Sequence, residues 1–300
     1  MEAQEGRLAA VFEQGLNQNP SPLRFVLRRS QLYVPGNNQK MIAKAANLGA
    51  DSVILDLEDA VPEESKDDAR STVVRLSQEI DWGRLELCVR INPKGTTHFG
   101  RDIAVLSDCP RIDCIVIPKA EGDCSPIGSR TRKSLIPVVE SAAGLMRVRE
   151  VAASKGAVAI SYGAADFAAS VGGSVPAYLD NLAVKTMIVA AAAEADLDAI
   201  DNVFFDLDDT KGFRKQAAAA RALGFVGKQV VHPSQVRLAN EAFSPSRKEI
   251  EWANRVLDEM GGAKGERRGA ITIDGSLVDA VHSRLAKDII ERAEEAGLLH

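Results

Sequence analysis

Two carboxylates, Glu140 and Asp166, are the side chains whose types and spacing point most directly to chemistry. Each comes just after a short apolar run that predicts a buried strand, and the two runs are consecutive in the chain. Carboxylates that meet at one edge of a sheet repel each other unless a proton or a cation lies between them. A hard divalent cation with oxygen ligands, of which Mg²⁺ is the natural candidate, would relieve this repulsion. Alternatively, one of the two acids caps the helix that follows it.

The turn that leads to Asp166 consists of three small residues, Gly163, Ala164 and Ala165. A turn of this kind between a strand and a helix leaves backbone N–H groups exposed to an anion. We therefore expect a substrate carboxylate to bind at these three residues, next to the metal. The same residues are also compatible with an ordinary tight connection that binds nothing.

Arg90 is a charged residue inside an apolar run, Val89–Pro93. A charge in a buried strand is costly unless it is paired or has a function. The planar guanidinium suits a carboxylate or a developing enolate oxygen, which predicts that Arg90 is a catalytic and substrate-binding residue. A structural ion pair with Asp56 or Glu58 is the alternative, and the two roles are compatible.

Three acids, Asp56, Glu58 and Asp59, follow another apolar run. Strand alternation places Asp56 and Glu58 on the same side, where they could hold Arg90 or a metal-bound water. Glu58 is therefore a further catalytic candidate. For Asp59, capping of a helix is as reasonable as a direct role in catalysis.

Eight short apolar runs, each typical of a strand buried on both faces, must position these residues. They are Leu32–Val34, Ser52–Leu57, Leu87–Ile91, Cys114–Ile117, Leu135–Val139, Ala157–Tyr162, Asn202–Phe205 and Gln229–Val231. Helices are predicted between them, including Asn38–Leu48, Glu63–Glu79, Gly144–Ala153, Tyr178–Ala195 and Thr210–Leu223, the last of which is capped by Gly224. This alternation favours an α/β fold, a TIM (β/α)8 barrel. An open doubly wound sheet is the alternative, but its dinucleotide form requires a glycine motif that Val34–Asn38 lacks.

Polar residues gather where the predicted strands end. They are Asp56, Glu58, Asp59, Arg90, Asn92, Lys119, Glu121, Glu140, Asp166 and His232. Because all strands of a TIM barrel end at one mouth, these residues would form one site. So many polar strand ends at one rim are difficult to explain as solvated surface.

The sequence divides the chain into three parts. Residues 1–24 are an N-terminal tail, residues 25–243 are the catalytic barrel, and residues 244–300 are a C-terminal helical segment and lid. In the last part we expect a helix from Pro245 to about Met260, a mobile loop at Gly261–Gly269, a short strand or turn at Ala270–Asp274 and an amphipathic helix over Asp279–Ala296.

Composition excludes several classes of protein. The chain has 300 residues, a formal net charge of −5 and 5% aromatic residues, and it lacks the basic clusters of a nucleic-acid-binding protein. It has no uninterrupted apolar run of about 18 residues to span a membrane, and no secretory signal. The four cysteines, none of them in a C-x-x-C pair, suit a reducing compartment, which predicts a cytoplasmic protein.

Seven motifs follow one another in a characteristic order. They are Arg29–Gly36, Leu55–Val61, Val89–Pro93, Ile117–Glu121, Pro137–Ser141, Tyr162–Phe167 and Gly224–Pro233. In these motifs the sequence resembles the citrate lyase β-subunit group, the CoA-lyase branch of the HpcH/HpaI aldolase family. The resemblance implies a TIM barrel that cleaves or forms a carbon–carbon bond in a 3-hydroxyacyl-CoA, with Mg²⁺ held by Glu140 and Asp166. It also implies that Arg90 binds the substrate near its reacting carbonyl.

The resemblance further implies a retro-Claisen reaction. A substrate such as citryl-, malyl- or citramalyl-CoA would give a 2-oxo acid and acetyl-CoA, so coenzyme A is part of the substrate. The base would be Asp279 of a neighbouring subunit, or a water held by Asp56 and Glu58, and Arg90 would stabilise the enolate oxygen. A residue from a neighbour requires a homo-oligomer, which we expect to be a trimer or a dimer of trimers.

Two alternatives stay open at this point. One is an HpaI-type aldolase that acts on free hydroxy-keto acids, and the other is a subunit of a lyase complex that depends on an acyl-carrier partner. The sequence does not locate the pocket for the nucleotide of coenzyme A. Basic residues that could meet its phosphates are Arg28, Arg29, Lys40, Lys228 and the Lys264–Arg268 loop.

Overall fold

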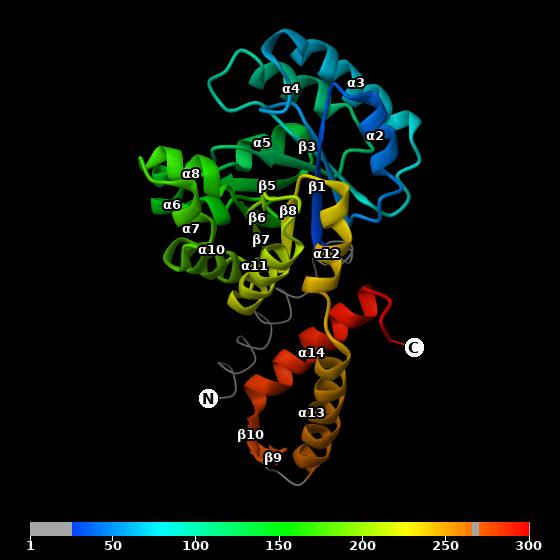
Figure 1. The fold of residues 1–300 in the computed structure, drawn as a ribbon, viewed down its shortest axis with the longest axis vertical. Coiled ribbons are helices and arrows are strands. Elements are labelled where there is room, and N and C mark those ends of the chain that lie inside the picture. The colour runs from blue at the N-terminus through cyan, green and yellow to red at the C-terminus, as the bar shows by residue number, and fades with distance from the viewer. Residues whose placement is uncertain (1–25, 266–269, 300) are drawn as a thin grey trace, which may run out of the picture.

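The computed structural model describes residues 26–265 and 270–299. Its centre is a closed barrel of eight parallel strands in sequence order, with the last strand hydrogen-bonded to the first (Figure 1). The strands are β1 (Ser30–Pro35), β2 (Ser52–Asp56), β3 (Glu86–Arg90), β4 (Cys114–Ile117), β5 (Ser134–Val139), β6 (Ala159–Tyr162), β7 (Asp198–Asp201) and β8 (Gly227–Val230). The predicted TIM (β/α)8 barrel is therefore confirmed.

Helices connect the strands and cover the outside of the barrel. They are α2 (Gln39–Ala45), η1 (Glu63–Ser65), α3 (Lys66–Glu79), α4 (Phe99–Ser107), α5 (Ser125–Thr131), α6 (Ala142–Met146), α7 (Val148–Ala152), α8 (Ala164–Ser170), α9 (Val175–Leu179), α10 (Leu182–Glu194), α11 (Thr210–Leu223) and α12 (Pro233–Phe243). No described helix is long and apolar enough to cross a membrane.

Caps explain where the helix predictions succeed and fail. The helix predicted over Thr210–Leu223 is α11, and Gly224 ends it in the left-handed conformation with a φ of 110°. The single helix predicted over Tyr178–Ala195 is instead two helices. The side chain of Asn181 accepts a hydrogen bond from the N–H of Val184 and so starts α10 as a new helix.

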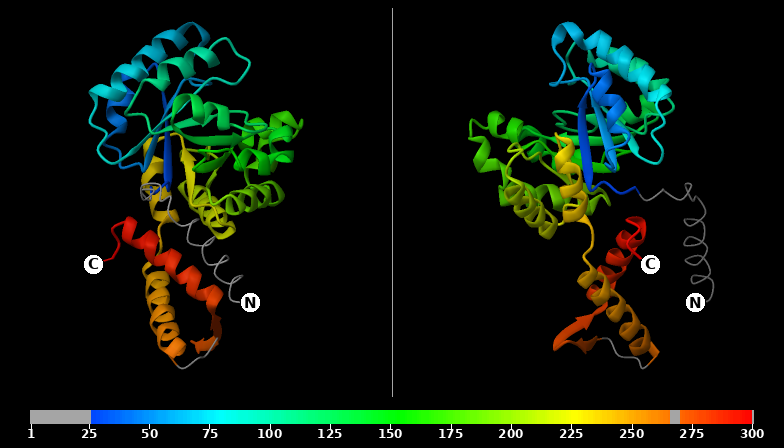
Figure 2. Two further views of the ribbon diagram at one scale, coloured as in Figure 1. Left: turned by 180° about the vertical axis from the view of Figure 1, so that it is seen from behind. Right: turned by 45° about the vertical axis from the view of Figure 1, so that its right-hand side comes forward.

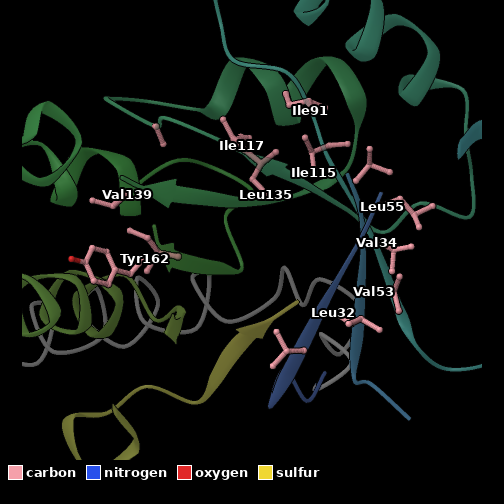
Figure 3. Packing of buried hydrophobic residues seen from close by; sticks show 14 of the residues in the cluster. Leu32, Val34, Val53, Leu55, Ile91, Ile115, Ile117, Leu135, Val139 and Tyr162 are labelled. Carbon is pink, nitrogen blue, oxygen red and sulfur yellow. The ribbon is translucent and has the colours of Figure 1, made fainter. Parts of the chain in front are cut away.

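Strands such as β2 and β4 are largely apolar on both faces because neighbouring side chains alternate between two cores. In β2, Ile54 belongs to a cluster inside the barrel, whereas Val53 and Leu55 belong to the larger cluster formed with the helices (Figure 3). In β4, Val116 points inward and Ile115 points outward in the same way. Continuous apolar runs are therefore the correct signal for these strands.

The same alternation carries polar side chains into the mouth of the barrel. Ile54, Cys88 and Val138 all belong to the cluster inside the barrel. Two residues further along each of these segments stand Asp56, Arg90 and Glu140. A period of two keeps them on the inner side, at the end where the strands finish.

The predicted seventh strand, Asn202–Phe205, is wrong. The strand is β7, four residues earlier, and Phe205 is instead 52% exposed. β7 leaves no continuous apolar run in the sequence, because an aspartate stands at each end of it. Asp201 is nonetheless fully buried, because Lys228 and Lys185 pair with its two carboxylate oxygens at 2.7 and 2.8 Å.

Three of the basic residues considered for phosphate contacts are structural instead. Arg28 pairs with Glu86 at 2.6 Å, Arg29 pairs with Asp51 at 2.8 Å, and Lys228 is buried against Asp201. Lys40 is exposed at the start of α2. The side chains of the Lys264–Arg268 loop lie outside the described residues.

The C-terminal segment folds around a small core of its own. It consists of α13 (Arg247–Gly265), β9 (Ala270–Ile273), β10 (Ser276–Asp279) and α14 (Ala280–Glu295). Its core residues are Ala253, Val256, Met260, Ile273, Val278 and Ala286. The expected strand at 270–274 and the final helix are confirmed. The loop expected from Gly261 is wrong as far as Gly265, because α13 continues to that residue, and residues 266–269 lie outside the described part.

This segment lies at the end of the barrel opposite its mouth (Figures 1 and 2). Residues Asp288–Arg292 of α14 approach Arg28, Ala157 and Asp198, which stand where β1, β6 and β7 begin. The segment is therefore not a lid over the mouth of its own barrel, because the described part lies at the amino ends of the strands.

Candidate active site

The mouth of the barrel contains a cavity of about 440 Å³. Its walls include Tyr33, Asp56, Asp59, Arg90, Val138, Glu140, Tyr162, Gly163, Ala164, Ala165, Asp166, Val203, Phe205, Gln229 and Val231. The residues predicted to bind metal and substrate are thus brought to one place. Of the two remaining predicted site residues, Glu58 lies directly behind this wall, and Asp279 is in the C-terminal segment.

Arg90 is held by acids on two sides. Its Nε and Nη2 donate to the two oxygens of Asp56 at 2.7 and 2.6 Å, and its Nη1 lies 2.9 Å from Oε2 of Glu58. The guanidinium also stacks on the ring of Tyr33, 4.9 Å from its centroid. Burial alone would lower the pKa of Arg90, but its contacts with Asp56 and Glu58 outweigh burial and raise it. The structural ion pair is therefore present, and it fixes a permanently charged donor in the cavity wall.

Glu58 is clamped between two cations. Its Oε2 faces Arg90, and its Oε1 lies 3.1 Å from Nζ of Lys119. Burial raises the pKa of this carboxyl and the charge of Asp59 adds to the rise, while Arg90 and Lys119 oppose it. The predicted sharing of Arg90 by Asp56 and Glu58 is confirmed by these contacts.

Glu140 is the most strongly perturbed acid of the mouth. It is 5% exposed, and its Oε1 accepts a hydrogen bond of 2.7 Å from the backbone N–H of Lys119. Burial, followed by the charges of Glu58 and Asp166, raises the pKa of this carboxyl to about 8. No described basic side chain forms an ion pair with Glu140. A cation at this position would therefore remove an electrostatic cost that the protein alone leaves uncompensated.

Gly163 makes room for the Glu140 carboxylate. A Cβ atom at this glycine would stand 2.5 Å from Oε2 and 2.6 Å from Cβ of Glu140. The φ of Gly163 is −103°, which any residue can adopt, so the glycine is required here for space and not for conformation. Oε2 of Glu140 thus lies against the turn that leads to Asp166.

Asp166 stands in the first turn of α8 and is exposed. Its charge helps to raise the pKa of Glu140, so the two carboxylates act on each other across the cavity. Ala164 and Ala165, the first residues of α8, line the same cavity. Their N–H groups have no acceptor one turn earlier in the helix. The acid pair and the amide turn therefore fit a divalent cation with an anionic ligand beside it.

One other group of possible metal ligands occurs in the described part of the chain. Glu86, Cys88 and Cys114 come together inside the barrel at the amino ends of the strands. Glu86 is already neutralised by Arg28, and burial raises the pKa of the Cys88 thiol. The hydrogen bond with Cys88 lowers the pKa of the Cys114 thiol, but burial and the charge of Glu86 outweigh it, so this pKa is raised as well. This cluster is thus a neutral part of the barrel interior, which leaves the Glu140 and Asp166 pair as the better cation site.

Asp279 is placed away from this mouth. Its carboxylate caps α14 by accepting from the N–H groups of Val281 and His282, and the His282 side chain lowers the pKa of Asp279. This aspartate is half-exposed, at the far end of the C-terminal segment. Within one chain it cannot reach the cavity.

Three residues at the mouth, Tyr33, Gln229 and Lys119, have contacts with the site that no motif of the sequence predicts. The hydroxyl of Tyr33 accepts a hydrogen bond from Gln229 at 3.1 Å beneath Arg90. Lys119 was recognised only as a polar strand end. What distinguishes Lys119 in the structure is its backbone, which lies in the left-handed region with a φ of 49°. A sequence does not show this conformation for a lysine.

Comparison with known proteins agrees with this geometry. A family model described as HpcH/HpaI aldolase/citrate lyase matches residues 29–233. The chain is 38% identical to the L-malyl-CoA/β-methylmalyl-CoA lyase of Rhodobacter capsulatus, over 93% of this chain and 98% of that protein. It is 33% identical to the mitochondrial citramalyl-CoA lyase of Homo sapiens, over 90% of this chain and 86% of that protein.

A solved structure is similar over nearly the same range. The CitE protein of Mycobacterium tuberculosis, in complex with magnesium, acetoacetate and coenzyme A, superposes with a TM-score of 0.76. It is 33% identical in sequence, and the match covers 89% of this chain and 98% of that chain.

Proposed function

Because the chain belongs to the HpcH/HpaI aldolase/citrate lyase family, we propose that Glu140 and Asp166 hold Mg²⁺ for a retro-Claisen reaction. The protein is a carbon–carbon lyase that acts on a CoA ester. The substrate is a 3-hydroxyacyl-CoA such as malyl-, citramalyl- or citryl-CoA, which gives a 2-oxo acid and acetyl-CoA. The observation that carries the assignment of the site is the buried Glu140 carboxyl, with its pKa raised to about 8 and without a described ion-pair partner.

Each part of the mouth has a separate role in binding. The N–H groups of Ala164 and Ala165 bind the carboxylate of the acid half, beside the acid pair. Mg²⁺, when bound, lowers the pKa of the substrate hydroxyl and neutralises charge on the acid half. Arg90 points its remaining N–H donors at the thioester carbonyl, because Asp56 and Glu58 fix the other side of its guanidinium.

Cleavage then requires two proton transfers and one stabilised anion. A base removes the proton of the substrate hydroxyl, the carbon–carbon bond breaks to leave the 2-oxo acid, and the electron pair passes to the thioester as an enolate. The enolate carbon then takes up a proton, which gives acetyl-CoA. Arg90 stabilises the enolate oxygen electrostatically, and the loss of one such preorganised donor costs roughly 10²–10³ in rate. Asp279 of a second copy is the base, with a water held by Glu58 as the second candidate.

The position of Asp279 supports a homo-oligomer. Because it lies at the opposite end of its own barrel from the mouth, it can act only in the mouth of another copy. An apolar stripe flanks it on β10 and α14, formed by Leu277, Val281 and Leu285, which are 68, 49 and 51% exposed. Assembly around the mouth, as a trimer or a dimer of trimers, would bury this stripe.

The substrate assay separates this function from its alternatives. The purified chain alone, with Mg²⁺, is expected to cleave at least one of malyl-, citramalyl- and citryl-CoA, with release of free acetyl-CoA. Turnover only of free hydroxy-keto acids would instead identify an HpaI-type aldolase. Turnover only after an acyl-carrier protein is added would identify a dependent subunit.

The four free, buried cysteines accord with our expectation of a cytoplasmic enzyme.

A further inference from the structure

Among the described residues, Lys119 is the one that donates hydrogen bonds to the carboxylates of both Glu58 and Glu140. It stands two residues after the end of β4 and lines two further cavities of about 830 and 480 Å³. The ammonium group thus approaches the acids from behind the 440 Å³ cavity that holds the acid pair. This position suits a group that acts through the acids and not on the substrate.

The backbone of Lys119 has an unusual conformation. Its φ is 49°, in the left-handed region, which is unfavourable for a residue with a side chain and is kept where the surrounding structure holds it. In this conformation its N–H donates to Oε1 of Glu140 at 2.7 Å. Oε1 is thereby engaged, and Oε2 is directed toward Gly163 and the turn that leads to Asp166.

The side chain of Lys119 completes the clamp on Glu58. Nζ lies 3.1 Å from Oε1 of Glu58, while Arg90 takes Oε2 at 2.9 Å. Without the ammonium, Glu58 would keep one cation instead of two. The carboxylate would then be free to rotate and to pull Arg90 out of position.

We propose that Lys119 is a positioning residue for the lyase reaction. This proposal rests on the proposed function of the site. Its ammonium holds Glu58 against Arg90, and its backbone amide orients Glu140 so that one carboxylate oxygen faces Asp166. The two halves of this role are separable, because one depends on the side chain and the other on the backbone conformation.

The backbone half is tested by Mg²⁺ binding, measured by calorimetry without substrate. Lys119→Gly and Lys119→Val both remove the ammonium, but only glycine adopts a φ of 49° easily. We expect Lys119→Gly to keep the Mg²⁺ affinity of the wild type and Lys119→Val to lose about tenfold or more, as for other groups that orient ligands. Equal affinities for the two variants would overturn the backbone role.

The side-chain half is tested by a double-mutant cycle in kcat. We expect Lys119→Met to lower kcat about 10–100-fold, and Lys119→Arg to restore most of it. In a Glu58→Gln background, the further change Lys119→Met should cost less than about threefold, because the clamp is already broken. An undiminished loss in that background would show that Lys119 acts independently of Glu58, and normal kcat in the single variant would also reject the role.

A control variant and the wild-type protein distinguish a failure of the role of Lys119 from a failure of the proposed lyase function. Lys94, an exposed lysine of the adjoining 830 Å³ cavity, forms no ion pair within the described residues, so Lys94→Met should leave kcat and Mg²⁺ affinity unchanged. A similar loss in this variant would mean that any nearby positive charge has the effect. A wild type that binds Mg²⁺ but cleaves no acyl-CoA would reject the proposed function, while the calorimetry would still decide the role of Lys119.

Discussion

Gly163→Ala changes the acid pair without altering any charge. The new Cβ would stand 2.5 Å from Oε2 and 2.6 Å from Cβ of Glu140, and 3.3 Å from Cγ1 of Val138. Ordinary carbon contacts are about 3.5–4.0 Å, so Glu140 would have to move by about 1 Å. It cannot do so freely, because its other oxygen accepts the 2.7 Å hydrogen bond from the N–H of Lys119.

Two magnitudes follow from this overlap. Overpacking of a closed site costs about 1–3 kcal/mol of the free energy of unfolding. A displacement of about 1 Å in a catalytic group costs about 10²-fold in rate. We therefore expect Gly163→Ala to lower kcat/KM about 100-fold, with weaker Mg²⁺ binding and a lower melting temperature.

A matched control uses a glycine with free space around it. Gly100 lies in α4, and a Cβ atom there meets no atom within 4 Å. Gly100→Ala should leave kcat/KM unchanged and should not lower the free energy of unfolding, because the new Cβ has free space around it. The assays are acetyl-CoA release under saturating Mg²⁺, calorimetry with Mg²⁺ and thermal unfolding. Wild-type turnover and Mg²⁺ affinity in Gly163→Ala would refute the reasoning.

Three further predictions concern the charges of the site. Because the pKa of Glu140 in the folded state, about 8, lies above the ordinary value of 4.5, the folded state binds an extra proton between these two pH values. Without Mg²⁺, the free energy of unfolding should therefore be highest, as far as this group is concerned, below about pH 4.5, and should fall by up to a few kcal/mol as the pH rises toward 8. In Glu140→Gln, thermal unfolding should lack this decrease of stability with pH. Arg90→Met should lower kcat about 10²–10³-fold and lower the free energy of unfolding by about 3–5 kcal/mol, because Asp56 is left buried without its ion-pair partner. A loss of activity with an unchanged midpoint of denaturant unfolding would contradict the importance of this ion pair for stability. Asp279→Asn and Asp166→Asn should each be inactive on their own. When the two variants are refolded together, activity should return at sites that combine the intact Asp166 of one copy with the intact Asp279 of another. No recovery would contradict the action of Asp279 between subunits.

The fold was predictable because a parallel barrel leaves a simple signal. Strands such as β4 and β5 are buried on both faces and appear as continuous apolar runs. The signal fails at β7, where Asp201 is buried only through Lys185 and Lys228, two residues that are distant in sequence. A pairing of that kind is a tertiary contact, and no local pattern reports it.

The candidate site was predictable in part for the same reason. Glu140, Asp166 and Arg90 follow or end clear strands, so their convergence follows from the topology of the barrel. The clamp by Lys119 was not predictable, since it depends on a left-handed backbone and on a side chain that reaches Glu58, in the loop after β2. The position of Asp279 also required the structure, because a sequence does not show at which end of the barrel the C-terminal segment lies.

The most direct test of the central claim is the anomalous scattering of Mn²⁺ in a crystal of the protein. Mn²⁺ prefers the same oxygen ligands as Mg²⁺ and identifies a metal position by itself. We expect an anomalous peak at about 2.0–2.3 Å from one oxygen of Glu140 and one oxygen of Asp166, beside the turn at Gly163. A peak elsewhere, or no peak with the two carboxylates turned apart, would contradict it.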